Sequence, residues 1–180
     1  AAGGAGRDPP RPTPEPGMDW RPAYVALGAN VGDPPAQLRE AFARLGSMPQ
    51  CRLVARSRLW RSAPLGPVAQ PDFVNAAAGL LTGLEARALL AELQRLERAM
   101  GRTPPVERWG PRLIDLDLLL VGDERVVGPD LELPHPGLHR RNFVLYPLAE
   151  FAPELWVPGR GRVWRLAAEA GAAGLQPLPE

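Results

Sequence analysis

The sequence contains no lysine, and all 21 of its basic side chains are arginine. P-loop nucleotidases need a lysine that reaches the phosphates, so this class of protein is excluded. Enzymes that form a Schiff base through a lysine amine are excluded for the same reason. If the chain binds phosphate, arginine is the residue expected to contact it, because a guanidinium group meets phosphate with two parallel hydrogen bonds.

Cysteine and aromatic residues are also scarce. The single cysteine, Cys51, excludes an internal disulfide and a thiolate metal site, and it is consistent with a reducing, cytoplasmic compartment. Its position in a predicted strand indicates a small core residue. Aromatic residues make up 6% and the net charge is +1, so nothing points to nucleic acid. No apolar run approaches the ~18 residues of a membrane span, so we expect no membrane partner.

The length of 180 residues predicts one domain with a proper core. Residues 1–22 are rich in glycine and proline and lack hydrophobic periodicity, which predicts a flexible tail. Residues 23–180 are then expected to form the single domain.

Hydrophobic periodicity predicts four strands and two long helices. In chain order they are strand 23–27, helix 34–45, strand 52–60, strand 72–82, helix 84–100 and strand 114–120. This β-α-β-β-α-β order is that of the ferredoxin-like α+β fold, an antiparallel sheet with both helices on one face. The remaining chain, with a short helix from Val163, is expected to form covering segments. We expect the face of the sheet opposite the two helices to be free for ligands.

Two aspartates alternate with apolar residues in the last of these strands. Because side chains alternate between faces, Asp115 and Asp117 are expected on one face, roughly 6.6–6.8 Å apart along the chain. Two carboxylates this close repel each other unless a cation lies between them. Arg108 and Arg112 precede the strand and are separated by a Gly-Pro turn. Carboxylates beside arginines are what a site for Mg²⁺ and phosphate requires.

An ordinary half-solvated strand with surface arginines is the alternative interpretation of this pattern. The Leu-Leu-Leu run at 118–120 favours the site, because it indicates a strand that is covered on both faces further along. The two aspartates would then lie where the sheet passes from core to cleft.

Other residues could complete such a site. Asn75 offers a donor and an acceptor side by side, which suits a heterocycle edge, and Phe73 shares its face and could stack on a ring. His135, between two prolines, could donate to a phosphate. The alternatives are a core Phe73, an Asn75 that caps a strand edge and a structural His135. The basic residues 139–141 could equally be a solvated turn, and Arg102 could satisfy carbonyls at a helix end.

Together these residues supply carboxylates for metal, arginines for phosphate and an aromatic/amide pair for a ring. That set is typical of phosphoryl-group transfer by positioning and electrostatics, without a covalent enzyme intermediate.

The motifs resemble those of the 6-hydroxymethyl-7,8-dihydropterin pyrophosphokinase family of folate biosynthesis. The resemblance covers about residues 23–153. Its most specific part is the Arg-Trp-Gly-Pro-Arg motif at 108–112 followed by Asp-Leu-Asp at 115–117, and weaker landmarks lie at 27–33, 64–75 and 134–143.

The resemblance implies transfer of pyrophosphate from ATP to the pterin hydroxymethyl group, with release of AMP. It implies that Asp115 and Asp117 bind two Mg²⁺ ions. The implied catalytic residues are Arg102, Trp109 and Arg112. The residues implied around ATP are Gln94, Glu97, Arg102, Arg112, Leu118, His135 and Arg141. The residues implied around the pterin are Ala63, Leu65, Phe73, Asn75, Asp115 and Phe143. A monomer that binds these two substrates is expected.

Two other functions remain open at this point. A non-catalytic ferredoxin-like module could bind RNA through its arginines, although acids nearly balance bases and stacking aromatics are few. An ordinary kinase would move only the γ-phosphoryl group, and the residues do not distinguish it from a pyrophosphokinase.

Overall fold

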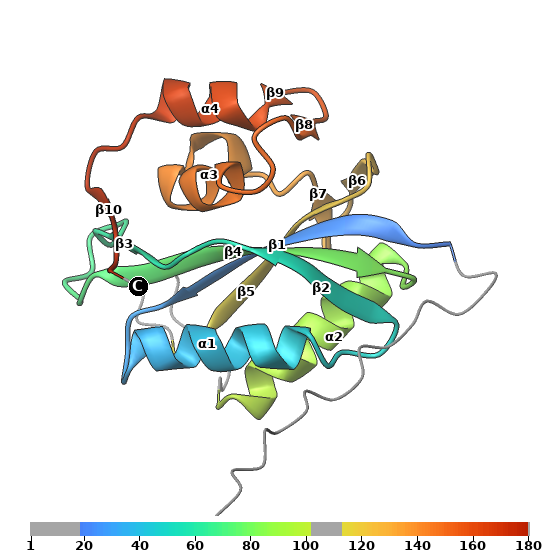
Figure 1. The fold of residues 1–180 in the computed structure, drawn as a ribbon, viewed down its shortest axis with the longest axis horizontal. Coiled ribbons are helices and arrows are strands. Elements are labelled where there is room, and N and C mark those ends of the chain that lie inside the picture. Colours follow the sequence, from blue (N-terminus) through green and yellow to red (C-terminus); the bar gives the residue numbers. More distant parts are fainter. Residues whose placement is uncertain (1–18, 102–112, 180) are drawn as a thin grey trace, which may run out of the picture.

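The computed structural model describes residues 19–101 and 113–179, with the main elements labelled in Figure 1. The main sheet and its two long helices comprise β1 (Arg21–Ala29), α1 (Pro34–Leu45), β2 (Cys51–Arg56), β3 (Trp60–Ser62), β4 (Phe73–Thr82), α2 (Ala86–Ala99) and β5 (Asp115–Val121). The remaining elements are β6 (Val126–Val127), β7 (Glu132–Leu133), the 3₁₀ turn η1 (Leu138–Arg140), α3 (Asn142–Ala149), β8 (Trp156–Val157), β9 (Gly161–Arg162), α4 (Val163–Ala170) and β10 (Leu175–Pro177).

The strands of the main sheet pair antiparallel in the order β10-β3-β4-β1-β5, and β2 also pairs with β4, next to β3. With β2 and β3 counted as one broken strand, the chain follows the predicted β-α-β-β-α-β order. Figure 1 shows α1 and α2 together on one side of this sheet. The predicted ferredoxin-like α+β fold is confirmed.

Amphipathic periodicity explains why the two long helices form where they do. In α1 the buried residues Leu38, Ala41, Phe42 and Leu45 recur at helical spacing, and Asp33 caps the first turn by accepting from the Ala36 amide at 3.2 Å. In α2 the buried residues include Leu89, Leu93 and Leu96. Both stripes pack on the sheet and form a core that we call the α1–α2 core.

The predicted strand 52–60 is wrong as a continuous strand, because it is interrupted between β2 and β3. At the break, the Ser57 hydroxyl accepts from the Ala77 amide at 2.9 Å, while the Ser57 amide donates to the Ala77 carbonyl at 2.9 Å. A side-chain oxygen therefore takes one place in the ladder of backbone hydrogen bonds, and the regular pairing with β4 is displaced there.

Strand β1 begins earlier than predicted. Arg21 pairs with Thr82 and Pro22 with Leu81, so the last two residues of the predicted tail belong to the sheet. The Pro22 carbonyl also accepts from the Gly122 amide at 2.7 Å, and Arg21 forms a 3.0 Å ion pair with Glu124. These contacts anchor the start of β1 next to the end of β5.

The face of the sheet opposite α1 and α2 is not open along its whole length. Figure 1 shows α3 and α4 stacked over it, including the predicted short helix from Val163. Ala26, Ala77 and Leu119 are buried there beneath the two helices, in what we call the α3–α4 core. The expectation of a fully free face is therefore wrong, because the apolar faces of α3 and α4 must themselves be buried.

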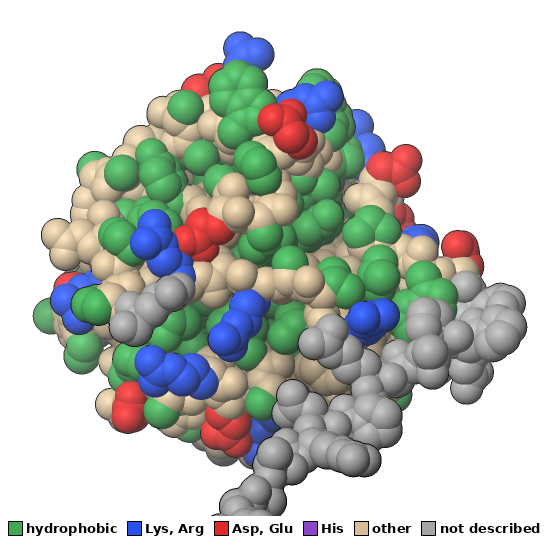
Figure 2. Space-filling view, viewed as in Figure 1, with side chains coloured by type: hydrophobic (Ala, Val, Ile, Leu, Met, Phe, Trp, Pro, Cys, Tyr) green, Lys and Arg blue, Asp and Glu red, His purple; other side chains and the backbone are tan. Residues whose placement is uncertain are grey.

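Charged side chains do not form a field of one sign on the face in Figure 2, where arginines and acidic residues are interspersed among apolar groups. Within residues 19–101 and 113–179, no helix is long and apolar enough to span a bilayer. Cys51 is buried and its Sγ lies 3.2 Å from the Thr82 hydroxyl, which confirms it as a core residue.

Candidate active site

Three neighbouring strands bring two of the predicted site residues into one row. Gly28 of β1 is in register with Asp115 of β5 on one side and with Asn75 of β4 on the other. Neighbouring strands lie about 4.8 Å apart, so Asp115 and Asn75 begin roughly 10 Å apart across Gly28. The i, i+2 rule puts them on the face covered by α3, because Ala77 and Leu119 lie in the α3–α4 core.

Gly28 leaves the middle of this row without a side chain. A Cβ at this position would lie 3.3 Å from Asn75 Oδ1 and 4.0 Å from Phe73 Cδ1, so the amide and the ring border the space above it. Gly28 and Phe73 are half-buried, whereas Ala26 and Ala77 further along the same strands are buried. The row therefore leaves a partly exposed stretch of bare backbone at Gly28, bordered by Asn75 and Phe73 on one side and by Asp115 on the other, and we call the space above it the opening.

The amide of Asn75 is buried and held in one orientation. Its Nδ2 donates to Ser62 Oγ at 2.7 Å, so its Oδ1 lies on the side of Gly28. Ala63 and Leu65, which follow β3, are exposed, and Leu65 keeps 44% of its surface accessible. Ser62 was not among the predicted site residues, and its only sequence signal is its position before the proline-rich loop.

A second residue that the sequence argument missed is Asn30. It is 3% exposed, and its Nδ2 donates to Gln70 Oε1 at 2.8 Å and to the Pro71 carbonyl at 3.0 Å. Asn30 thus ties the end of β1 to the loop that carries Ala63 and Leu65. In the sequence it reads as part of a turn, and only the fold reveals this anchoring role.

The two aspartates lie as the strand periodicity predicts. Asp115 and Asp117 alternate with the buried Leu116 and Leu118, and both are half-buried, whereas the next residue on their face, Leu119, is 1% exposed. The strand passes from a covered end to a partly exposed end at these carboxylates. Within the described residues no three His, Cys, Asp or Glu side chains converge as a metal cluster.

His135 lies within electrostatic reach of both Asp115 and Arg141. The His135 amide donates to the Leu119 carbonyl of β5 at 2.9 Å, and its Nδ1 accepts from the Gly137 amide at 3.2 Å. The pKa of His135 is lowered from 6.5 to about 4, chiefly by burial and then by the Arg141 charge, and Asp115 partly opposes the shift. The imidazole is therefore neutral at pH 7, with its proton on Nε2. A Cβ on Gly137 would lie 2.5 Å from Arg141 Nε, so the guanidinium packs directly over this glycine.

The lowered pKa of His135 predicts a loss of stability in acid. The unfolded chain takes up this proton below pH 6.5, but the folded chain takes it up only near pH 4, so the free energy of unfolding falls as pH falls between these values. The expected loss is about 3 kcal/mol. Urea unfolding between pH 7.5 and 4.5 measures it. His135→Gln is expected to flatten the slope and His139→Gln to leave most of it, and equal slopes in the wild type and His135→Gln would contradict the assignment.

Three residues predicted around the nucleotide lie on the α2 side of β5. Glu97 is 6% exposed and accepts from the Leu116 amide at 3.2 Å, so it caps the outer edge of the strand. Leu118 is 3% exposed and packs into the α1–α2 core, which leaves little of its side chain for a ligand. Gln94 is exposed on α2. Together with His135 and Arg141 they border both faces of β5, which is an edge strand of the sheet.

Phe143 is half-buried on α3, which packs on β4. The remaining predicted site residues, Arg102, Trp109 and Arg112, lie outside the described residues. Their roles stay predictions.

The 7,8-dihydro-6-hydroxymethylpterin-pyrophosphokinase (HPPK) family model matches residues 24–153 of the chain. The chain belongs to this family. The match contains the whole row of Asp115, Gly28 and Asn75, together with His135 and Arg141. The resemblance inferred from the motifs is thereby confirmed.

Curated relatives support the same assignment over most of the chain. A Pseudomonas aeruginosa protein named 2-amino-4-hydroxy-6-hydroxymethyldihydropteridine pyrophosphokinase is 44% identical over 156 residues, which covers 87% of this chain and 96% of that protein. A Haemophilus influenzae protein of the same name is 44% identical over 136 residues, covering 76% of this chain and 84% of that protein.

Solved structures agree on the fold. A crystal structure of the A437G variant of Plasmodium falciparum HPPK-DHPS with pteroate superposes with a TM-score of 0.68 over 86% of this chain and 41% of that chain, at 12% identity. At this identity the likeness supports the fold alone.

Proposed function

We propose that the chain transfers the pyrophosphoryl group of ATP to the hydroxymethyl group of 6-hydroxymethyl-7,8-dihydropterin, with release of AMP, as a step of folate biosynthesis. Membership in the pyrophosphokinase family supports this reaction. The structural observation that carries it is the row Asp115–Gly28–Asn75, which joins a carboxylate to a buried amide across a side-chain-free floor.

The opening above Gly28 is proposed to hold the pterin ring. Asn75 presents an amide, the group that can pair with both a donor and an acceptor on the edge of a flat heterocycle. Phe73 borders the opening and Phe143 lies on the helix that packs over β4, so the two rings are proposed to enclose the pterin. Backbone groups near Ala63 and Leu65 would complete the pocket around the edge of the pterin ring.

The chemistry of the carboxylate pair suits Mg²⁺. The ion takes oxygen ligands and usually binds one or two protein carboxylates together with substrate phosphates, and Asp115 and Asp117 offer that number of carboxylates on one face. Bound here, two Mg²⁺ ions would neutralise charge on the ATP phosphates. The absence of a third acidic ligand among the described residues agrees with a site that phosphate oxygens complete.

The triphosphate is proposed to lie along β5 between the carboxylate pair and Arg141. Arg141 supplies a cation, and neutral His135 supplies an Nε2–H donor without adding charge. Gln94, Glu97 and Leu118 would surround the rest of the nucleotide on the α2 side. Arg102, Arg112 and Trp109 are proposed to balance charge and to close over the site.

In the proposed reaction the pterin hydroxyl oxygen forms a bond to the β-phosphorus of ATP. The bond from that phosphorus to the oxygen bridging the α-phosphate breaks, AMP leaves with that oxygen, and the hydroxyl proton is released to solvent. The protein contributes by holding the hydroxyl and the phosphorus in line and by stabilising negative charge, and a direct transfer of this kind needs no nucleophile from the protein.

Product identity tests the proposal against ordinary γ-phosphoryl transfer. With ATP, Mg²⁺ and 6-hydroxymethyl-7,8-dihydropterin, ³¹P NMR is expected to show AMP and a pterin diphosphate in equal amounts. Formation of ADP and a pterin monophosphate would overturn the assignment in favour of a simple kinase. An RNA-binding function is disfavoured by the interspersed charges in Figure 2, and strong, salt-dependent RNA retention on filters would revive it.

We further propose that the enzyme works as a monomer in the cytoplasm. The single buried cysteine is compatible with a reducing compartment. Sedimentation equilibrium at micromolar concentration would measure the oligomeric state directly.

A further inference from the structure

The stretch of chain after α4 links the helical layer to the edge of the sheet, and we call residues 171–178 the C-terminal strap. It leaves α4 at Gly171, whose amide donates to the Ala167 carbonyl at 3.0 Å, and it continues as β10 beside β3. After β10, the Leu178 amide donates to the Leu59 carbonyl at 2.9 Å. Figure 1 shows the strap descending from α4 to the sheet. The function proposed above assigns it no role.

The strap completes the pairing of β3. Leu175 of the strap is in register with Ser62 of β3, and the other side of β3 pairs with β4. Without β10, the three residues of β3 would form an edge strand held from one side only. Ser62 accepts the hydrogen bond of 2.7 Å that orients Asn75. The strap therefore supports the wall of the opening that presents the Asn75 amide.

The same strap is tied to α3 by Asn142, the first residue of that helix. Asn142 Nδ2 donates to the Gly171 carbonyl at 2.9 Å and to the Ala173 carbonyl at 3.0 Å, so both of its amide hydrogens are used. Asn142 directly precedes Phe143, the second ring assigned to the pterin. One short segment thus contacts both walls of the proposed pterin site, the Asn75 wall through β3 and the Phe143 wall through Asn142.

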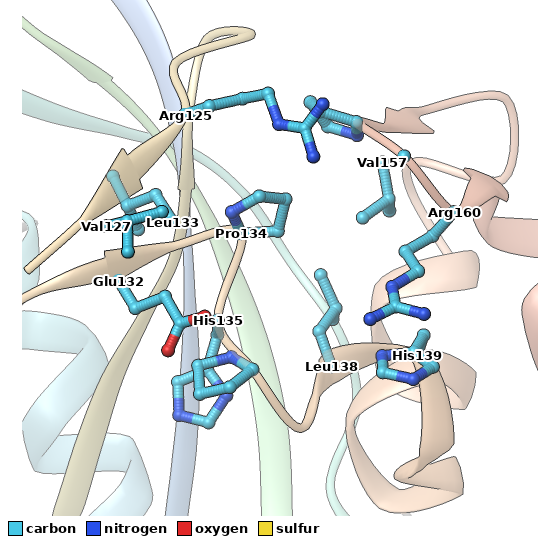
Figure 3. Close-up of a pocket in the computed structure, with 13 residues that line it drawn as sticks. Arg125, Val127, Glu132, Leu133, Pro134, His135, Leu138, His139, Val157 and Arg160 are labelled. Carbon is cyan, nitrogen blue, oxygen red and sulfur yellow. The ribbon is translucent and has the colours of Figure 1, made fainter.

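The chain that leads into α3 is less closely packed on another side. A pocket of about 270 Å³ lies between residues 132–139, which precede α3, and the turn between β8 and β9 (Figure 3). Figure 3 shows Pro134 and Val157 on opposite sides of this hollow. The β8–β9 hairpin therefore does not clamp the segment before α3 along the pocket, and the hydrogen bonds of Asn142 matter more for where the helix starts.

Glycine at position 171 allows the strap to present its carbonyl to Asn142. Gly171 has φ 73° and ψ 166°, a backbone conformation that is open essentially to glycine alone. A Cβ on Gly171 would meet no atom within 4 Å, so the glycine serves the conformation of the backbone rather than a shortage of space. An alanine here would change the direction of the carbonyl without a direct clash.

Arg141, the residue before Asn142, has contacts of its own that do not involve the strap. Its carbonyl accepts from the Val144 and Leu145 amides at 3.0 Å each, and its guanidinium packs over Gly137. Loss of the Asn142 hydrogen bonds would therefore leave the proposed triphosphate contact in place. An effect of the strap on the pterin can thus be separated from an effect on the nucleotide.

We propose that Asn142 is a positioning residue for the pterin, which acts by fixing Phe143 to the C-terminal strap. In this role the strap keeps Phe143 and Asn75 at a fixed separation, so the pterin meets a preformed slot that it does not have to order on binding. The inference rests on the proposed function, which places the pterin between these two residues.

Calorimetric titration of the full chain with 6-hydroxymethyl-7,8-dihydropterin, in the presence of Mg²⁺ and a non-hydrolysable ATP analogue, tests this role. Asn142→Ala and Gly171→Ala are each expected to weaken pterin binding about tenfold, because hydrogen bonds between α3 and the strap are lost or misdirected. Affinity for the ATP analogue alone is expected to stay within twofold. In the steady state, the KM for the pterin should rise about tenfold, with kcat within threefold.

Gly161→Ala and Glu150→Ala are the matched controls. Gly161 also has a positive φ, 116°, and open surroundings, so its alanine variant carries backbone strain away from the strap. Glu150→Ala removes the 2.6 Å ion pair with Arg58 just beyond the other end of α3. Each control is expected to lower the melting temperature and to leave pterin affinity within twofold.

Fluorine NMR reads the position of Phe143 without any ligand. The chain contains four phenylalanines, so labelling with 4-fluorophenylalanine gives four resonances, and Phe143→Leu assigns the one from Phe143. Asn142→Ala and Gly171→Ala are expected to shift or broaden this resonance and to leave that of Phe42, in the α1–α2 core, unchanged.

Three results would overturn the proposal. An equal loss of pterin affinity in the strap variants and the controls would reduce Asn142 to a contributor to general stability. A loss of nucleotide affinity as large as the loss of pterin affinity would contradict a role at the pterin, and an unchanged Phe143 resonance would show that the strap does not fix the ring. A wild-type chain that bound no pterin would instead overturn the proposed function, and the fluorine spectra would still decide whether the strap fixes Phe143.

Discussion

Replacing either Asp115 or Asp117 with asparagine is expected to lower kcat for AMP formation by about a thousandfold, because each variant removes one charge from the proposed metal site. Asparagine keeps the shape of the side chain, and both positions are half-buried at the partly exposed end of β5, so folding is expected to persist. Steady-state AMP production across a Mg²⁺ titration measures the loss. A higher Mg²⁺ requirement should accompany it.

Asp123→Asn is the matched control for these variants. Asp123 lies in the turn after β5 and is exposed, and the change removes the same charge a few residues away. Its kcat and Mg²⁺ dependence are expected to match the wild type within twofold. If Asp115→Asn or Asp117→Asn kept more than a tenth of wild-type kcat at unchanged Mg²⁺ dependence, the carboxylate pair would not be the metal site.

Replacing Asn75 with leucine is expected to weaken pterin binding by about a hundredfold, because the ring edge loses both a donor and an acceptor in a buried setting. Leucine has the same number of side-chain heavy atoms in the same branched arrangement, and the lost hydrogen bond to Ser62 is a single interaction, so the sheet should still form. Calorimetric titration of the pterin, with Mg²⁺ and a non-hydrolysable ATP analogue present, measures the affinity.

Ser62→Ala provides the comparison for Asn75→Leu. It keeps the amide but removes the acceptor that orients it at 2.7 Å, so we expect a loss of about five- to tenfold in pterin affinity. Binding of the ATP analogue alone should not change in either variant. A loss in nucleotide affinity as large as the loss in pterin affinity would show that Asn75 acts through the fold rather than through the ring.

The local pattern of apolar and polar residues was sufficient to predict most of the secondary structure. The apolar stripes of α1 and α2 and the two-residue alternation of β5 are properties of short stretches of chain, so their positions could be predicted to within a few residues. The break between β2 and β3 could not, because it depends on a hydroxyl of Ser57 that replaces a backbone partner of Ala77 on another strand.

The candidate site, too, was predictable from the sequence only in part. That Asp115 and Asp117 share a face, and that Phe73 shares one with Asn75, follows from strand periodicity. That Asp115 and Asn75 border one opening depends on the register of β5, β1 and β4, which brings together residues that are far apart in the chain. The anchoring role of Asn30 depends on contacts 40 and 41 residues away.

Residue type and spacing alone therefore indicated the fold class, the carboxylate pair and the family, because these depend on local periodicity and on contiguous motifs. Strand pairing was needed to define the bare backbone at Gly28. The packing of α3 and α4 was needed to cover most of the sheet face opposite α1 and α2.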